Sequence, residues 1–430
     1  MDGERKTAAG ERVFHWQAPR IKFGPGAVAE LGYELAALGV GTAVLVTDPG
    51  VEAAGLTEVA VASAARAGVR VHVYAGTELE PTDVSCEKAA QELAGLGADG
   101  YVGLGGGSSI DTAKIVNLLH AHPGIRIRDV LNRPVGAGMA IPGPLRPLIA
   151  VPTTAGTGSE CTAMVALGLP DLGIKTGISD AAVRPDLAIV DPELTVSCPS
   201  GVTASSGYDV LTHACESYTA RAYDARGAYA SPGERPLYAG SNPISDIWAE
   251  QALRLLGEFF RRAVLSPWDL PARTAMSQAA LFAGFGFGNA GTHVPHACAY
   301  PIAGRVRDYR AKDYPGDHAM IPHGQAVVVT AAEAFEFTFD TAPDRHLRAA
   351  ELLGADVSGL SRAAARRVLP DTVRALVADT GGPDGVGAFG YTAADVPDLV
   401  AGALQQQRLL ACCPRDVRAE DLHRVIEASL

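Results

Sequence analysis

The pattern of hydrophobic residues changes once along this chain, near residue 192. Before that point, short runs rich in β-branched residues alternate with alanine-rich stretches of helical periodicity, and after it the patterns are helical only. Strands that alternate with helices are typical of a doubly wound, mostly parallel sheet. The sequence therefore predicts an α/β domain over residues 1–192 and an all-helical domain over residues 193–430.

The segments behind this prediction are short and clearly bounded. The expected parallel strands are residues 43–47, 69–74, 100–104, 148–151 and 187–190, with an antiparallel hairpin at 163–168 and 174–178. The expected helices of the second half include residues 247–262, 273–282, 347–353, 362–379 and 393–404. An irregular insert at about residues 220–242 is rich in Gly, Pro, Tyr and Ala. We expect this loop to close over a cleft or to meet a partner subunit.

Length and charge exclude several classes of protein. The 430 residues are 47% hydrophobic and 20% charged, which is enough for two sizeable cores. A net charge of −12 argues against a nucleic-acid surface, which would need a basic stripe. No apolar run approaches the ~20 residues of a membrane span.

The N-terminus and the cysteines bear on the compartment. The chain begins with polar residues, and acids at Asp2, Glu4 and Glu11 are atypical of transit peptides, which are acid-poor. Seven scattered cysteines without a C-x-x-C pair suggest reduced thiols. We therefore expect a cytoplasmic protein.

Four residues predict a metal site. Asp209 and His213 lie four residues apart in a helical stretch, so their side chains project from one face. Alone, this pair is a weak signal, since a buried Asp can simply accept a hydrogen bond from a neighbouring His. His296 and His323 add two imidazoles in apolar, glycine-rich surroundings. One oxygen and three nitrogens suit a borderline divalent metal, and no thiolate favours a closed structural zinc site.

A glycine turn follows the expected strand 100–104. Gly105, Gly106, Gly107 and Ser108 precede a helical stretch that contains Asp111. A strand, a glycine turn and a helix start place free backbone N–H groups and the helix dipole around an anion. The turn matches neither G-x-G-x-x-G nor the Walker A loop, and an ordinary tight βα turn is the alternative.

Two further strand ends offer cofactor contacts. After strand 148–151, the loop 152–160 supplies hydroxyls and glycines suited to phosphates and a nicotinamide ring. Its candidate residues are Thr153, Thr154, Thr157 and Ser159. Asp48 follows strand 43–47, where a carboxylate can bind a ribose diol and repel a 2′-phosphate, favouring NAD over NADP. Asp48 is equally compatible with a plain turn.

In their order and joint presence, these motifs resemble the iron-containing (group III) alcohol dehydrogenases. The resemblance runs from residues 23–27 past His323, most of the chain. It implies an N-terminal dinucleotide-binding domain, an all-helical C-terminal domain, a dehydroquinate synthase-like architecture and metal-assisted hydride transfer between them. The implied cofactors are NAD and a divalent metal, Fe(II) or alternatively Zn(II). Lys175 matches a family lysine that reaches the cofactor ribose, although it is also compatible with a solvent-facing hairpin position.

Segments 239–249, 285–291 and 309–314 resemble a narrower branch, the hydroxyacid-oxoacid transhydrogenases. This implies passing a hydride from a hydroxyacid such as 4-hydroxybutyrate to an oxoacid such as 2-oxoglutarate, with bound nicotinamide as the carrier. Many members of the wider family have a second His, assigned to proton relay, four residues after the third ligand. Tyr300 stands there in this chain, so Tyr300 or the nearby His293 is expected to handle the proton.

Other interpretations stay open at this point. They are an NAD-dependent alcohol dehydrogenase that releases its cofactor at each turnover, a lyase or cyclase like dehydroquinate synthase, and a binding protein with a vestigial site. The substrate carboxylate calls for an Arg fork or a Lys, and Arg226, Arg235 and Lys312 are candidates, although a solvated loop charge is the more common state of such residues. We also expect a homodimer.

Overall fold

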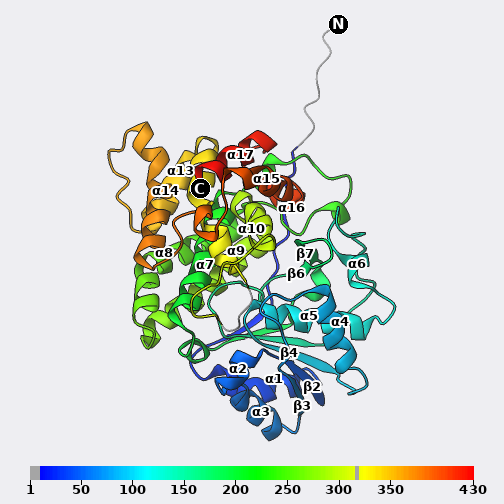
Figure 1. The fold of residues 1–430 in the computed structure, drawn as a ribbon. Coiled ribbons are helices and arrows are strands. Elements are labelled where there is room, and N and C mark those ends of the chain that lie inside the picture. Colours follow the sequence, from blue (N-terminus) through cyan, green and yellow to red (C-terminus); the bar gives the residue numbers. More distant parts are fainter. Residues whose placement is uncertain (1–9, 315–318) are drawn as a thin grey trace.

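The computed structural model describes residues 10–314 and 319–430. Its first half contains a six-stranded sheet in the order β1-β8-β5-β4-β2-β3, in which all neighbours pair in parallel (Figure 1). The strands are β1 (Arg20–Phe23), β2 (Thr42–Val46), β3 (Arg70–Tyr74), β4 (Gly100–Gly105), β5 (Leu148–Pro152) and β8 (Leu187–Val190). The predicted α/β class and parallel sheet are confirmed.

The central strands are apolar throughout because both faces of the sheet are covered. In β2, Ala43 and Leu45 belong to the core under α1 (Leu31–Ala37) and α3 (Leu56–Arg66). Val44 and Val46 face the other way, toward α4 (Asp83–Glu92) and α5 (Gly107–Ala121). Alternate residues thus serve two cores, as the two-residue period of a strand requires.

The hairpin forms a separate two-stranded antiparallel sheet of β6 (Met164–Leu169) and β7 (Ile174–Ser179), as expected. The edge strand β1 was not predicted, because its four residues are only partly buried and show no clear alternation. The short helices α2 (Pro49–Ala53) and α6 (Ile127–Val130) complete this half.

The order of the strands creates a crevice at one end of the sheet. From β2 the chain moves outward to β3, and it then returns to the other side of β2 to form β4. The connections therefore leave β2 and β4 in opposite directions. In open α/β sheets, ligands bind at the carboxyl ends of the strands beside such a switch point. Asp48 and the glycine turn after β4 both lie at this end.

The second half is helical, and its buried residues form two main cores. One core joins α7, α8, α9, α13 and α14, and the other joins α10, α11, α15 and α17. The helices are α7 (Ser200–Thr219), α8 (Pro243–Leu265), α9 (Leu270–Ala290), α10 (Val294–Gly304), α11 (His323–Val328), α12 (Ala331–Thr338), α13 (Pro343–Leu352), α14 (Arg362–Asp379), α15 (Val396–Leu404), α16 (Gln407–Leu410) and α17 (Ala419–Ala428). No helix among the described residues is long and apolar enough to cross a membrane.

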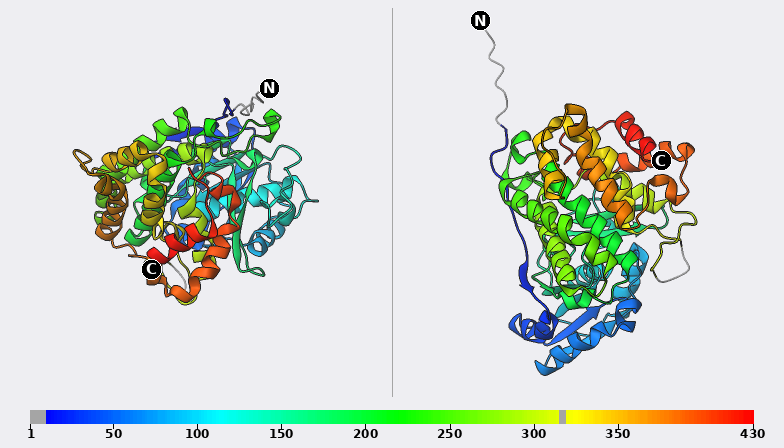
Figure 2. Two further views of the ribbon diagram at one scale, coloured as in Figure 1. Left: turned by 90° about the horizontal axis from the view of Figure 1, so that it is seen from above. Right: turned by 90° about the vertical axis from the view of Figure 1, so that its left-hand side faces the viewer.

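The N-terminal segment connects the two halves of the chain. It runs along the helices before it enters the sheet as β1 (Figure 2). Gln17 is held by Asn289 of α9, which accepts from the Gln17 N–H at 2.8 Å and donates to its carbonyl at 3.0 Å. The insert at 220–242 is a loop, and Arg235 in it pairs with Glu11 at 3.1 Å. The insert therefore packs against the N-terminal segment. The proposed boundary at residue 192 stays a prediction.

Candidate active site

Helix α7 carries three acidic or imidazole side chains on one face. Asp209, His213 and Glu216 follow one another at spacings of four and three residues, and all three are buried. Residues at these spacings stack along a helix. Buried ionisable groups require partners, and here the partners come from α10 and α11.

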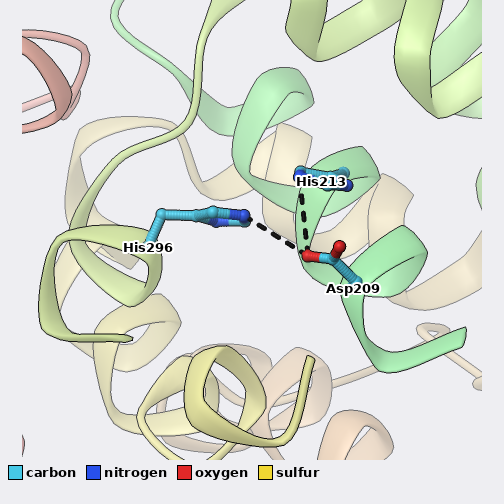
Figure 3. A group of neighbouring side chains, drawn as sticks. All are labelled: Asp209, His213 and His296. Atoms are coloured by element: carbon cyan, nitrogen blue, oxygen red, sulfur yellow. Dashed lines mark ion pairs between the residues drawn. The ribbon is translucent and has the colours of Figure 1, made fainter. Parts of the chain in front are cut away.

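Three imidazole nitrogens converge on one carboxylate oxygen. Asp209 Oδ1 lies 3.5 Å from His213 Nε2, 3.5 Å from His296 Nε2 and 3.7 Å from His323 Nε2. His296 belongs to α10 and His323 is the first residue of α11. Figure 3 shows Asp209 and His213 on one helix with His296 pointing toward them from another. The structure therefore brings together all four residues that the sequence analysis singled out as ligands.

Packing fixes the orientation of His213. Its ring stacks on Phe287 with centroids 3.7 Å apart and on His296 with centroids 4.6 Å apart. Phe287 lies in the glycine-rich end of α9, where Gly284 lets the loop after β5 come close, since a Cβ on Gly284 would lie 3.0 Å from Cys161 Cβ. From the side of that loop, a Cβ on Gly158 would lie 2.9 Å from the Phe287 ring. The crowded small residues noted in the sequence thus serve the packing of the site.

Glu216 is the site residue that the sequence analysis missed. Its Oε1 accepts a hydrogen bond from His296 Nδ1 at 2.6 Å, and its Oε2 accepts one from the His293 backbone N–H at 2.5 Å. The first bond fixes the ring so that Nε2 points at Asp209. The signal was present in the sequence, because Glu216 lies seven residues after Asp209 on the same helical face.

Electrostatics favour an ionised Asp209 and a protonated His296. Burial opposes the ionisation of Asp209, but His213, His323 and His296 outweigh it and hold the pKa of that carboxyl well below its usual range. Burial also opposes a charge on His296, yet Glu216 and Asp209 raise its pKa to about 9. His213 shows the opposite balance, since burial lowers its pKa to about 3. Two carboxylates thus stabilise a cation at this point.

The donor atoms fit a divalent metal. Asp209, His213 and His296 each offer one ligand atom within 4.8 Å of the others. Asp209 Oδ1 and His296 Nε2 are buried and form no hydrogen bond among the described residues. Buried polar atoms without a partner are costly, and a shared cation would satisfy both. A carboxylate that orients the far nitrogen of a ligating His, as Glu216 does, is a common feature of metal sites.

Two cavities meet at this group. The inner cavity, of about 170 Å³, is lined by all four candidate ligands. The outer cavity, of about 390 Å³, lies at the carboxyl ends of β2 and β4 and is lined by Asp48 and by the loops after β4 and β5. His323, Gly107 and Thr157 line both. A long ligand in the outer cavity can therefore reach the four candidate metal ligands.

Two glycines of the turn after β4 hold positions that a side chain would not tolerate. Gly105 has φ +151°, a conformation that other residues rarely adopt, and Gly107 begins α5. A Cβ on Gly107 would lie 2.7 Å from Thr157 Oγ1, so only a glycine fits there. Of the residues predicted to bind the cofactor, Gly106, Gly107, Ser108, Thr153, Thr154 and Thr157 line the outer cavity, whereas Gly105 does not.

Asp48 has the structural role of a turn residue and also lies at the wall of the outer cavity. Its Oδ1 caps α2 by accepting from Gly50 N at 2.9 Å and Val51 N at 3.0 Å. Its Oδ2 accepts from Ser109 Oγ at 3.2 Å, on the side of the glycine turn. Asp48 lines the outer cavity, so its carboxylate faces a ligand bound there while it holds the start of α2 and Ser109.

Asp111, Ser159 and Lys175 line the inner cavity and not the outer one. Asp111 Oδ1 lies 3.3 Å from Lys114 Nζ, and burial drives both groups toward their neutral forms, raising the pKa of Asp111 and lowering that of Lys114. Lys175 forms an ion pair with Glu80. These three predicted cofactor contacts therefore share a cavity with the four candidate metal ligands.

The two proton-relay candidates occupy different places. Tyr300 lines the inner cavity, and its ring centroid lies 6.4 Å from that of His323. His293 is fully buried and does not line either cavity. Its Nε2 lies 3.2 Å from Thr219 Oγ1, and burial lowers its pKa to about 4. Of the two, only Tyr300 is placed to touch a substrate.

The three cations suggested for the substrate carboxylate lie elsewhere. Arg226 donates to the Tyr238 carbonyl at 3.0 Å, and Arg235 is paired with Glu11. Lys312 belongs to a loop whose backbone lies beside Gly201. None of these three residues lines either cavity.

Comparisons with known proteins agree with this geometry. The family model for iron-containing alcohol dehydrogenase matches residues 18–192, and that for the C-terminal part of the Fe-containing alcohol dehydrogenase family matches residues 237–430. The chain is 44% identical over 420 residues to the mitochondrial hydroxyacid-oxoacid transhydrogenases of Bos taurus and of Homo sapiens, covering 97% of this chain and 90% of each relative.

Solved structures show the same fold. A 1,3-propanediol oxidoreductase matches with a TM-score of 0.84 and 28% identity, over 97% of this chain and 100% of that one. A sulfoacetaldehyde reductase from Bifidobacterium kashiwanohense, in complex with NAD⁺, matches with a TM-score of 0.78 and 26% identity, over 97% of this chain and 99% of that one.

The relatives overturn one expectation and establish the family. The cytoplasmic location is wrong, because the transhydrogenases that match nearly the whole chain are named mitochondrial. That expectation depended on Asp2 and Glu4, which lie outside the described residues, and on Glu11, whose carboxylate has a structural role in pairing with Arg235. The chain belongs to the iron-containing alcohol dehydrogenase family and, within it, to the branch of the hydroxyacid-oxoacid transhydrogenases.

Proposed function

We propose that this enzyme transfers a hydride from a hydroxyacid such as 4-hydroxybutyrate to an oxoacid such as 2-oxoglutarate, with a nicotinamide that stays bound between the two half-reactions. The observation that carries the proposal is the junction of the two cavities at His323, Gly107 and Thr157. It allows one ligand to extend from the carboxyl ends of the strands to the convergent imidazoles. The relatives named hydroxyacid-oxoacid transhydrogenase support the choice of substrates.

Family membership implies a nicotinamide cofactor and a divalent metal. We propose Asp209, His213, His296 and His323 as the metal ligands, with Fe(II) as the physiological ion and Zn(II) as the alternative, since the donor set does not separate them. When bound, the ion supplies a Lewis acid for the alcohol or carbonyl oxygen of the substrate. Glu216 holds His296 in the orientation that this role needs.

The nicotinamide is proposed to be NAD, held along the outer cavity. The N–H groups at the start of α5 face its phosphates, and Gly106, Gly107 and Thr157 let the backbone approach closely. Asp48 binds the ribose diol and disfavours a 2′-phosphate. The remaining predicted contacts are Gly105, Ser108, Thr153, Thr154, Asp111, Ser159 and Lys175, of which the last three would act near the nicotinamide ring because they line the inner cavity.

Tyr300 is proposed to hydrogen-bond the reacting oxygen of the substrate. It is buried, it lines the inner cavity, and its hydroxyl forms no hydrogen bond with another described residue. His293 is proposed to act through Glu216, which accepts its backbone N–H. We also propose that the enzyme is a homodimer and that its two domains divide at residue 192.

An isotope experiment tests the proposal. 4-Hydroxybutyrate with deuterium on the carbinol carbon is mixed with 2-oxoglutarate and excess unlabelled NADH. A transhydrogenase delivers the label to 2-hydroxyglutarate, because the hydride never visits the free cofactor. Dilution of the label into the NADH pool would instead establish an alcohol dehydrogenase that releases its cofactor at each turnover.

A further inference from the structure

The inner cavity is lined by an arginine from the far C-terminal part of the chain. Arg408 lies in the short helix α16, more than 190 residues after the metal ligands of α7. It is half-buried, and its guanidinium carbon lies 5.0 Å from the ring centroid of Tyr238, which also lines this cavity. A guanidinium over an aromatic face is held in place without losing its hydrogen-bond donors.

Charge balance sets Arg408 apart from the other charged residues of the cavity. Each acid there already has a cationic or imidazole partner: Glu80 pairs with Lys175, Asp111 pairs with Lys114, and Asp209 faces the histidines. Arg408 forms no ion pair among the described residues, and it is the one lining cation of which this is true. The inner cavity therefore has a positive charge in excess at this wall.

The position of Arg408 is fixed from several sides. Leu409 and Leu410, which follow it, are buried in the second helical core. Tyr238 is buried, and its hydroxyl donates to Met164 Sδ at 3.4 Å. Arg226 holds the backbone of Tyr238 through the 3.0 Å bond to its carbonyl. The insert at 220–242 thus supports the aromatic ring on which Arg408 rests.

The remaining walls suit a short carbon chain. Met164, Ala166, Leu167 and Leu409 are apolar, and they line the cavity together with Arg408 and the metal group. The volume of about 170 Å³ is far above the roughly 10–15 Å³ that a cavity needs to hold one water, so a small acid has room. Burial raises the pKa of Tyr300, Arg408 opposes this and Asp209 adds to it, so Tyr300 lies within the electrostatic reach of both Arg408 and Asp209.

We infer that Arg408 binds the carboxylate of the hydroxyacid and oxoacid substrates and so selects acids over plain alcohols. This inference rests on the proposed function. The reacting oxygen lies at the imidazole group, the methylene chain crosses the apolar wall, and the carboxylate meets the guanidinium. A planar guanidinium can bind a carboxylate through two parallel hydrogen bonds.

The test compares two substrates in matched variants. Arg408→Met keeps the length and removes the charge, and Arg408→Lys keeps the charge and loses the fork. We expect Arg408→Met to lower kcat/KM for 4-hydroxybutyrate by at least about 30-fold, mainly through KM, because a desolvated carboxylate loses its partner. Its kcat/KM for 1-butanol, which lacks the carboxylate, should stay within a few-fold of the wild type. Arg408→Lys should recover part of the loss.

Control measurements separate the possible failures. Arg415→Met removes an exposed arginine of the same segment, which packs on Phe337, and it should leave both substrates unaffected. If the wild type turns over 1-butanol but no hydroxyacid, the proposed function itself fails and the inference fails with it. If the wild type uses hydroxyacids and Arg408→Met loses both substrates equally, or neither, Arg408 does not select the carboxylate. Should Arg408→Met fail to fold, Arg408→Gln and Arg408→Lys give the same comparison.

Discussion

Glu216 controls the orientation of a metal-ligand candidate from another helix. It accepts from His296 Nδ1 at 2.6 Å and is completely buried. Glu216→Gln removes the charge but keeps the size, so the preference of the site for a cation should weaken. We expect the metal affinity to fall by about 10- to 100-fold, as for other carboxylates that orient ligating histidines.

A competition titration against a chelator of known affinity measures this change. Glu250→Gln is the matched control, because Glu250 accepts from Tyr218 and pairs with Arg348 away from the site. An affinity equal to that of the wild type would show that His296 is oriented by packing alone.

Glu160 should make stability depend on pH. The residue is completely enclosed, and burial raises its pKa to about 7, against the smaller effect of Lys114. The folded protein therefore keeps a proton that the unfolded chain, with a carboxyl pKa near 4.5, has released. Stability falls as the pH rises through this window and levels off above about 7.

Glu160→Gln lacks this ionisable group. Between pH 4.5 and pH 8, its free energy of unfolding should rise relative to that of the wild type by up to about 3 kcal/mol. Melting temperatures of both proteins across this range measure the change, and Glu92→Gln on the exposed face of α4 is the surface control. A constant difference between Glu160→Gln and the wild type would show that Glu160 is ionised in the folded protein.

At the scale of residues, sequence spacing could predict those site residues that lie on the same face of one helix. Asp209 and His213 were found from their four-residue spacing, and Glu216 could have been found by extending it. Arg408 could not have been found in this way, because α16 is only four residues long and has no periodicity. Its role depends on the fold bringing α16 to the cavity wall.

At the scale of elements, the cap of α2 links the fold to cofactor choice. Asp48 Oδ1 caps this helix while the carboxylate lines the outer cavity. Asp48→Ser keeps a good cap and removes the charge. We expect the ratio of kcat/KM for NADP over NAD to rise roughly tenfold or more, since about 1.4 kcal/mol of removed repulsion has that effect.

Asp48→Ala is the matched comparison, since it removes both the charge and the cap. It should shift cofactor preference equally and also lower stability by about 1 kcal/mol, measured by thermal or denaturant unfolding. An unchanged preference in both variants would leave Asp48 as a helix cap only.

The elements that could be predicted from the sequence are those in which every residue is buried to the same degree. β2, β4 and β5 are buried on both faces, so they appear in the sequence as continuous apolar runs. The prediction ended α9 eight residues too early, because its last part contains three glycines, which disfavour a helix unless packing requires them. In α9 packing does require them: Gly284 lies against Cys161, and Gly286 lies against Ser217.

At the scale of the whole molecule, the site exists only because distant elements meet. The outer cavity takes residues from the loops after β2, β4 and β5 and from α7 and α11 of the second half. The inner one takes residues from the hairpin, from α7, α10 and α11, and from the C-terminal α16. The sequence contains the ligand set but not the junction of the two cavities, since the junction follows from how the helices pack on the sheet. Motifs thus identified the branch of the family, but not the cavity wall at which Arg408 is inferred to bind the substrate carboxylate.

The metal should stabilise the entire fold, because its proposed ligands join three helices that are far apart in the chain. A ligand that binds only the folded state adds RT ln(1 + [L]/Kd), about 4 kcal/mol at a thousandfold excess over Kd. Removing the ion with a chelator should therefore lower the melting temperature by several degrees, and adding Fe(II) or Zn(II) should restore it. His296→Ala should contain no metal, show no turnover and melt at a temperature that no longer responds to the ion, whereas His423→Ala, on the exposed face of α17, should respond like the wild type. A metal-dependent melting temperature that persisted in His296→Ala would place the ion elsewhere in the protein.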